Sequence, residues 1–264
     1  MNGAAAPGRM ARHAIAFETI FRKEARRFLR IWPQTLVPPA ITMTLYFVIF
    51  GNLIGRRIGT MGGHDYLDYI VPGLIMMSVI TSAYANVVSS FFGAKFQRFV
   101  EELLVAPVPG YVILAGFVAG GMVRAMLVAG LVTGVSLFFT DLRIAHPLVT
   151  LSVMLLTAAL LAVAGFINAL YAKTFDDISI VPTFVLTPLT YLGGVFYSID
   201  LLPVFWQTIS RFNPILYLVN AFRFGMLGDS DISLAAAYGI MLLALAIAVG
   251  WALWLLNRGF GLRS

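Results

Sequence analysis

The sequence contains no cysteine, and charged residues make up only 11% of its 264 residues. Without cysteine the chain can form no disulfide, no thiolate nucleophile and no Cys-based metal site. Soluble domains carry about a quarter charged residues, whereas 60% of this chain is hydrophobic. A soluble fold could not bury so much apolar surface. The composition therefore excludes a soluble globular domain and indicates a protein that uses lipid as the solvent for much of its surface.

Motifs of catalysis and nucleotide binding are missing as well. The three histidines are far apart in the sequence, and there is no HExxH, no GxSxG and no phosphate loop ending in Gly-Lys-Ser or Gly-Lys-Thr. The long apolar runs contain no carboxylate, although ion-coupled carriers usually place one at membrane depth. We therefore expect no catalytic residue, no metal and no bound cofactor in this chain, and an energy source outside it.

What the chain does have is six apolar stretches near the length of about 20 residues that crosses the hydrocarbon core. They cover residues 32–55, 69–92, 111–139, 148–171, 179–197 and 234–256. Among Asp, Glu, Lys, Arg and His, only Arg124 occurs within them. The sequence predicts an all-α integral membrane protein with six transmembrane helices.

Basic residues are distributed unevenly between the two sides of these spans. Twelve fall on the side of the N-terminus, namely Arg9, Arg12, Arg22, Lys23, Arg26, Arg27, Arg30, Lys95, Arg98, Lys173, Arg258 and Arg263. Five fall on the other side, namely Arg56, Arg57, Arg143, Arg211 and Arg223. Since Lys and Arg accumulate in cytoplasmic segments, the distribution predicts that both termini are cytoplasmic.

The segment before the first span has an apolar face and a basic face. Ala14, Phe17, Phe21, Ala25, Phe28 and Trp32 recur at spacings of three and four residues. Arg22, Lys23, Arg26, Arg27 and Arg30 lie on the other face. The pattern predicts an amphipathic helix that lies along the cytoplasmic leaflet and is broken by Pro33. The alternative is a topology signal without fixed structure.

Residues 93–107, between the second and third spans, predict a short cytoplasmic helix. Its apolar face is formed by Phe96, Phe99, Val100, Leu103 and Leu104, and its charged face by Lys95, Arg98, Glu101 and Glu102. Pro107 and Pro109 end it. Such a helix either docks into a groove on a soluble partner or packs back onto the bundle, and the pattern alone favours neither.

Residues 193–226 are apolar but interrupted by polar residues and prolines. Broken, partly inserted helices satisfy such a composition when protein covers the irregular backbone. We expect a re-entrant hairpin at about 197–214 on the outer side, with Phe196 and Tyr197 among the aromatic residues at the headgroup boundary.

Arg124 lies in the middle of the third span. A charge at membrane depth normally faces the protein interior or a wet cavity. It either contacts an anionic substrate group or makes a structural bond to helix carbonyls or across a subunit interface; the structural interpretation is favoured. Gly116, Gly120 and Gly121 precede it and permit close helix approach, within the chain or at a dimer interface.

The order of these features resembles the ABC-2 type transporter permeases. The details that carry the resemblance are EELLVAPVP at 101–109, GGVFYSIDLLPVFWQTISRFNP at 193–214 and Arg223. In that family a Gly-rich end of the fifth span precedes a Pro-containing hairpin, an Asn-Pro pair and an Arg. The resemblance covers essentially the whole chain and is strongest to small exporters of the drug-resistance, nodulation-factor and polysaccharide type, particularly the bacterial YadH-like group.

The resemblance implies the permease subunit of an ATP-binding-cassette exporter in the bacterial inner membrane, which moves an amphiphilic, lipid-like, glycan or drug substrate. It implies a homodimer and two copies of a separate ATPase that binds ATP and Mg, with no nucleic acid as partner. Segment 93–107 would be the coupling helix, with Lys95, Arg98, Glu101 and Glu102 at the ATPase contact.

The same resemblance divides the chain into an N-terminal arm at 1–31, a transmembrane domain at 32–258 and a cytoplasmic tail at 259–264. The arm, with Arg22, Arg26 and Arg27, would brace the ATPase from the membrane side. Arg124, Phe196 and Tyr197 are candidates for the substrate path or a subunit interface.

Two other classes of function are weaker alternatives. A secondary carrier or passive channel would need internal inverted repeats and an ion-binding group at membrane depth, and the sequence shows neither. A membrane enzyme would need a polar catalytic cluster; Asp176 and Asp177 are the nearest approach to a carboxylate pair. They follow Lys173 in a short turn, where a solvated or partner-facing role is favoured. Nothing in the sequence selects the substrate.

Overall fold

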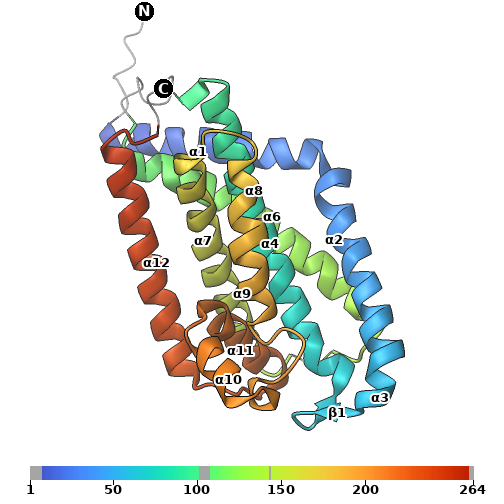
Figure 1. The fold of residues 1–264 in the computed structure, drawn as a ribbon. Helices are drawn as coiled ribbons and strands as arrows, with labels where there is room; N and C mark the ends of the chain where they lie inside the picture. The colour runs from blue at the N-terminus through green and yellow to red at the C-terminus, as the bar shows by residue number, and fades with distance from the viewer. Residues whose placement is uncertain (1–7, 101–107, 143, 262–264) are drawn as a thin grey trace, which may run out of the picture.

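The computed structural model describes residues 8–100, 108–142 and 144–261, which fold into a bundle of helices (Figure 1). The elements in chain order are α1 (Arg9–Arg30), α2 (Trp32–Tyr46), the π-helix η1 (Phe47–Gly55), α3 (Arg56–Ile58), β1 (Thr60–Met61), β2 (His64–Asp65), α4 (Tyr66–Phe96), α6 (Gly110–Ser136), α7 (Pro147–Tyr171), α8 (Asp177–Val181), the π-helix η2 (Pro182–Leu186), α9 (Thr187–Tyr191), the 3₁₀-helix η3 (Ile199–Leu201), α10 (Val204–Arg211), α11 (Pro214–Leu227) and α12 (Leu234–Asn257). Within these described residues the only strands are β1 and β2, which form a short antiparallel pair. The predicted all-α fold is confirmed.

Five helices within the described part of the chain are long and apolar enough to cross a membrane. They are Trp32–Gly55, which combines α2 and η1, and α4, α6, α7 and α12. Their ends lie within about one helical turn of the predicted spans. Long apolar runs form helices in lipid because only a helix satisfies every backbone donor and acceptor within the segment.

The fifth predicted span, 179–197, is shorter than expected. The helix formed by α8, η2 and α9 ends at Tyr191. Gly193 and Gly194 follow, and Gly194 has φ 72°, a conformation that favours glycine. At 1.5 Å per residue, 177–191 measures about 22 Å, less than a hydrocarbon core of about 30 Å.

The outer hairpin is displaced along the sequence from its predicted position at 197–214. Its first arm is α10, whose Phe205 is 67% exposed, and its second arm is α11, whose Leu216 is fully buried. The buried arm is therefore α11, which extends beyond the predicted range. Backbone N–H groups of Ala145 and His146 donate to the carbonyls of Met226 and Gly225 at 3.0 and 2.7 Å, so neighbouring protein satisfies the end of this short helix, as membrane depth requires.

The helices differ strongly in how much of their surface the chain itself covers. Of the most apolar window of α4, 83% is buried, compared with 22% for α12 and 12% for the helix Trp32–Gly55. α4 is thus the centre of the bundle, packed against α6, α7 and α11. α1 lies across the end of the bundle at which α12 also ends, whereas α10, α11 and β1 lie at the opposite end (Figure 1). We call the first the inner end and the second the outer end.

Candidate coupling and transport sites

The N-terminal helix α1 is seated on glycines of α6 at the inner end. A Cβ atom at Gly116 would lie 2.6 Å from Ile20 Cγ2, and one at Gly120 would lie 2.6 Å from Glu24 Cβ. Gly121 faces another neighbour, because its Cβ would lie 2.5 Å from Val87 Cγ2 on α4. The three glycines therefore serve packing within the chain.

The predicted amphipathic helix is present, but its buried side is rotated from the predicted apolar face. The fully covered residues are Ile20, Glu24 and Phe28, spaced by four. Phe17 is 37% exposed, and its ring stacks on that of Phe21 at 6.1 Å between centroids. α1 therefore packs one stripe against α6 and leaves a neighbouring phenylalanine stripe for lipid.

The three arginines predicted for this helix have different surroundings. Arg22 and Arg26 are exposed, and Arg22 Nη2 lies 2.5 Å from Glu18 Oε1 on the same helix. Arg27 is turned toward the bundle, where its Nη2 donates to Asn86 of α4. Arg22 and Arg26 are thus available to a partner protein, whereas Arg27 faces the bundle.

Glu24 is the centre of a polar cluster beneath α1. Its side chain is 0% exposed, and its Oε2 accepts from Ser90 Oγ at 2.5 Å and from Arg27 Nε at 3.3 Å. Arg27 Nη2 also donates to Asn86 Oδ1 at 2.8 Å and to the Asn86 carbonyl at 3.1 Å. We call Glu24, Arg27, Asn86, Ser90 and Arg124 the elbow cluster, because α1 turns into α2 about one helical turn after it.

Arg124 joins the elbow cluster from α6. Its Nη1 lies 3.4 Å from Asn86 Oδ1, so one amide oxygen accepts from two guanidinium groups. Arg124 is half-buried, and within the described residues its Nε has no hydrogen-bond partner. The sequence left Arg124 between a substrate contact and a structural contact. In the structure Arg124 hydrogen-bonds to the side-chain amide of Asn86. This bond positions the guanidinium group but does not neutralise its charge.

The sequence did not single out Glu24, Asn86 or Ser90. Glu24 lies outside the spans, and Asn86 and Ser90 are uncharged residues within α4. The available signal was the four-residue spacing of Ile20, Glu24 and Phe28. That spacing places a carboxylate on a helical face that is otherwise apolar, where a buried charge needs partners.

Lys95, predicted to contact an ATPase, is engaged within the chain. It lies in the last turn of α4, and its Nζ donates to the carbonyls of Ala169, Leu170 and Ala172 at 3.4, 3.0 and 2.6 Å. These carbonyls lie at the C-terminus of α7, where helix carbonyls lack intrahelical partners and attract a cation. Lys95 therefore ties the inner ends of α4 and α7 together.

The rest of the predicted coupling segment follows a turn. α4 ends at Phe96, and Arg98 is exposed and adopts φ 62°. Segment 93–107 is thus not one helix from its start, because its first residues belong to α4. Glu101 and Glu102 lie outside the described residues.

Asp177, one of the two adjacent carboxylates considered above as a catalytic pair, has a structural role in the turn after α7. Its Oδ2 accepts from the backbone N–H groups of Lys173 and Thr174 at 2.8 and 2.9 Å. The carboxylate thereby holds the turn at the start of α8, and Asp176 beside it is exposed.

Aromatic side chains join α2 to the end of α9 at the outer end. The Phe196 ring lies 4.9 Å from that of Phe50, 5.7 Å from Tyr46 and 5.7 Å from Tyr191, between centroids. Tyr197 donates from its hydroxyl to the Tyr191 carbonyl at 3.0 Å, and burial raises the pKa of Tyr197. We call these five residues the outer aromatic cluster; in it Phe196 packs among rings and Tyr197 braces the backbone after α9.

Arg223 fastens the outer hairpin to the centre of the bundle. It is 1% exposed, and its Nη2 donates to the Gly194 carbonyl at 2.6 Å. Its Nε lies 3.4 Å from the Tyr69 carbonyl, and its Cζ lies 4.1 Å from the centre of the Tyr69 ring. Arg223 therefore connects α11, α4 and the turn after α9 through one side chain.

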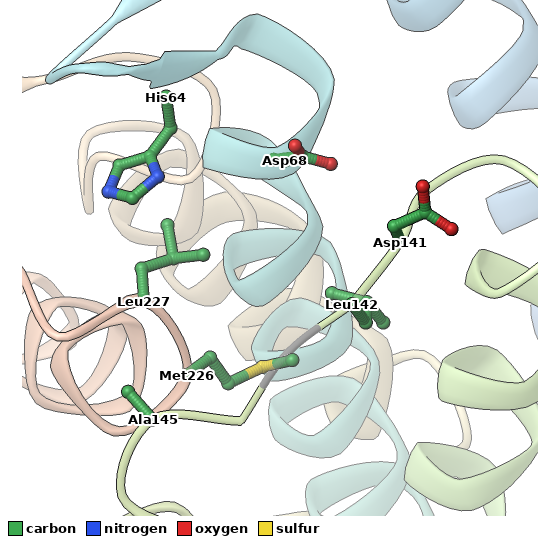
Figure 2. Close-up of a pocket in the computed structure, with 7 residues that line it drawn as sticks. All are labelled: His64, Asp68, Asp141, Leu142, Ala145, Met226 and Leu227. Carbon is green, nitrogen blue, oxygen red and sulfur yellow. The ribbon is translucent and has the colours of Figure 1, made fainter.

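Two pockets open beside this fastening at the outer end. Figure 2 shows the larger one, of about 300 Å³, which His64, Asp68 and Asp141 line together with Met226 and Leu227 of α11. The smaller, of about 220 Å³, also contains His64, and its lining includes Arg223 and Asp229. His64 Nε2 lies 2.8 Å from Asp229 Oδ2, so the β1–β2 hairpin is tied here to the loop before α12.

The arrangement so far is that of a membrane bundle with a helix clamped across one end and a hairpin fastened into the other. The family model of the ABC-2 type transporter matches residues 15–227, which run from within α1 to the end of α11. The sequence resemblance is thereby confirmed.

Curated relatives extend this match to nearly the full chain. The inner membrane transport permease YadH of Escherichia coli (strain K12) is 59% identical over 251 residues, covering 95% of this chain and 98% of that protein. Nodulation protein J of Rhizobium leguminosarum bv. trifolii is 27% identical over 217 residues, covering 81% and 82%. Nodulation protein J of Rhizobium meliloti (strain 1021) is 26% identical over 189 residues, covering 70% and 71%.

These matches and the membrane-spanning helices place the chain in the bacterial inner membrane as a multi-pass protein. The family is one of transport permeases and implies an ATP-binding-cassette ATPase as partner. This chain belongs to the ABC-2 type transporter family, as a transport permease of an exporter.

Proposed function

We propose that two copies of this chain and two copies of a separate ATPase form an exporter for an amphiphilic substrate. The observation that carries the proposal is the low burial of the first spanning helix, whose most apolar window is only 12% buried in the chain's own fold. A helix with so few contacts in its own chain has a surface for a second copy. ATP and Mg would be bound by the ATPase, and this chain would supply the path.

A strip of α4 suits a path for an amphiphile between two copies. α4 is otherwise the most buried helix, yet Thr81, Ala85 and Ser89 are exposed along one line at spacings of four. The strip has no large apolar side chain, and it offers two hydroxyl oxygens as acceptors, since both hydroxyls donate to carbonyls of α4. The flanking helices α2 and η2 expose Leu45 (55%) and Phe184 (73%). Polar and apolar groups side by side match a substrate with both kinds of surface.

The inner end is where an ATPase would push. α1 lies there, and α4 and α7 are tied together there by Lys95. In this proposal Arg98, Glu101 and Glu102 contact the ATPase, and Lys95 transmits the force to two spanning helices. Movement of the inner ends would open the path toward the outer leaflet or the outside.

Labelling of single cysteines in the naturally cysteine-free chain tests the orientation. We expect Thr60→Cys, exposed on β1, to react with a membrane-impermeant maleimide in intact spheroplasts. Lys173→Cys, exposed at the other end, should react only after the membrane is opened. Since the two substitutions lie on opposite ends of the same bundle, the reverse result would place the termini outside and overturn the orientation.

Co-purification tests the proposed assembly. We expect the tagged permease, expressed with the ATPase encoded beside it and extracted in mild detergent, to carry the ATPase in a two-plus-two complex that hydrolyses ATP. Glu101→Arg/Glu102→Arg should abolish assembly or hydrolysis, because like charges would then meet at the ATPase contact.

A charge reversal at the outer end is the control for this double variant. Asp200→Arg changes an exposed carboxylate on η3 and should leave the complex intact. If the permease binds no ATPase and moves a solute by itself, a secondary carrier replaces the exporter.

A further inference from the structure

The elbow cluster has more positive than negative charge. Arg27 and Arg124 both direct a guanidinium group at Asn86 Oδ1, at 2.8 and 3.4 Å. Glu24 is the one carboxylate that hydrogen-bonds to the cluster within the described chain. Two cations and one anion leave a net positive charge at a site largely screened from water, where unbalanced charge is unfavourable.

The cluster also has hydrogen-bond donors in excess. Arg124 Nε and Asn86 Nδ2 are buried and have no partner among the described residues. Arg27 uses its Nε and Nη2 on Glu24 and Asn86, and no partner of its Nη1 is found in the described part of the chain. Glu24 Oε1 is the one acceptor of the cluster that lacks a partner there. The unpaired donors and the net positive charge both favour a ligand that accepts hydrogen bonds and carries negative charge.

The cluster can be reached from the membrane. Arg27 keeps 30% of its side chain exposed, and Arg124 is half-buried. Arg27 belongs to α1, which lies across the inner end of the bundle (Figure 1). An amphipathic helix of this kind lies at the level of lipid headgroups, and on the two turns before Glu24 it exposes Phe17 and leaves Phe21 half-buried. The arginines can therefore contact the anionic oxygens of a lipid while the phenylalanines of α1 contact its acyl chains.

We propose that the elbow cluster binds the phosphate group of a membrane amphiphile, with Arg27 and Arg124 as its ligands. A phosphate offers several acceptor oxygens to two planar guanidinium forks, a geometry in which arginine binds strongly. Glu24 and Ser90 act as positioning residues that hold Arg27. Binding would fix α1 to α4 and α6, so the same ligand would stabilise the inner end.

Lipid binding by the purified permease without an ATPase tests the site. Dioleoylphosphatidic acid is titrated into the protein in detergent and bound lipid is counted by native mass spectrometry, with dioleoylglycerol as the phosphate-free comparison. We expect the phosphate-bearing lipid to bind more tightly. Arg124→Gln and Arg27→Gln should each weaken it by about tenfold or more, the loss expected for a charged hydrogen bond.

Arg26→Gln is the matched control, because Arg26 is an exposed arginine on the same helix at the same membrane level. It should leave affinity near that of the wild type. Arg124→Lys keeps the positive charge and should retain part of the lipid binding. If Arg124→Gln does not fold, the affinity of Arg124→Lys tests the site instead. Equal binding of both lipids, equal affinity of wild type and Arg124→Gln, or equal loss in Arg26→Gln would overturn the site. Displacement by inorganic phosphate at the lipid's own concentration would overturn the requirement for an amphiphile.

A second measurement separates a transported substrate from a resident lipid, and only this arm rests on the proposed function. In proteoliposomes with the ATPase, phosphatidic acid that stimulates ATP hydrolysis in the wild type but not in Arg124→Gln identifies the site as part of the transport path. Binding without stimulation identifies a resident lipid, and either result supports the site. Because binding is measured without the ATPase, failure of the exporter and failure of the site are distinguishable.

Discussion

Replacing Arg223 by methionine is expected to remove most of the folded permease from detergent extracts. The side chain is 1% exposed and donates to the carbonyls of Gly194 and Tyr69. Methionine has a similar length but no donor, so both carbonyls lose a buried partner, and the contact with the Tyr69 ring is lost as well. Losing two buried hydrogen bonds to a charged donor costs about 3–5 kcal/mol in total, which corresponds to a fall in melting temperature of about 10 °C or more.

Arg211→Met is the matched control for this prediction. Arg211 also lies on the outer hairpin, but its side chain is exposed, and surface substitutions usually change stability by less than about 0.5 kcal/mol. The melting temperatures of both variants are obtained by heating detergent-solubilised samples and measuring the fraction that remains monodisperse by size-exclusion chromatography. Equal melting temperatures for the two variants would show that Arg223 does not fasten the hairpin.

The role of Arg223 illustrates what could not be predicted from the sequence. An arginine downstream of the hairpin was visible as part of the family pattern. Its acceptors, however, lie 154 and 29 residues away in the chain. Local patterns report which side of a helix is apolar, but not which distant backbone carbonyl will meet a given side chain.

The spanning helices, in contrast, could be predicted well. Each long apolar run has one stable conformation in lipid, so length and composition were sufficient for five of the six spans. The remaining span, predicted at 179–197, was misplaced at its end. The apolar sequence continues past Tyr191 into 192–197, whereas the helix ends at Tyr191. Gly193 and Gly194, after Tyr191, were the signal that this run would end.

The charged residues at the inner end were predicted least well. Lys95 has the spacing of a solvated helix face, yet it caps α7. Glu24 lies among basic residues, yet it is fully covered. Both outcomes depend on how one helix crosses another, and crossing is decided by the glycines of the partner helix rather than by the charged residue itself.

This crossing gives the inner end a definite mechanical arrangement. α1 contacts α6 through the glycines and α4 through the elbow cluster, while Lys95 joins α4 to α7. A force on α1 or on the segment after α4 would therefore act on three spanning helices together. The outer end has its own fastening in Arg223, so the two ends can be tested separately.

Gly120→Val is expected to lift α1 from the bundle while the spanning helices stay folded. A Cβ at this position would lie 2.6 Å from Glu24 Cβ, a separation that side chains do not adopt. Relieving it must shift α1 and separate Glu24 from Ser90, and overpacking of this kind costs about 1–3 kcal/mol. We expect amide hydrogen exchange in α1 to accelerate by about tenfold and ATP-driven transport to be lost.

Gly130→Val makes the same substitution almost three turns further along α6, where a Cβ would meet nothing within 4 Å. Valine has a slightly better helix propensity than glycine. This variant should therefore show the amide hydrogen exchange and the transport activity of the wild type. Comparing the two by hydrogen-exchange mass spectrometry isolates the contact with α1 from any general effect of valine in the helix. If Gly120→Val leaves α1 protected but still blocks transport, the glycine acts through something other than seating α1, and the coupling role assigned to that helix fails with it.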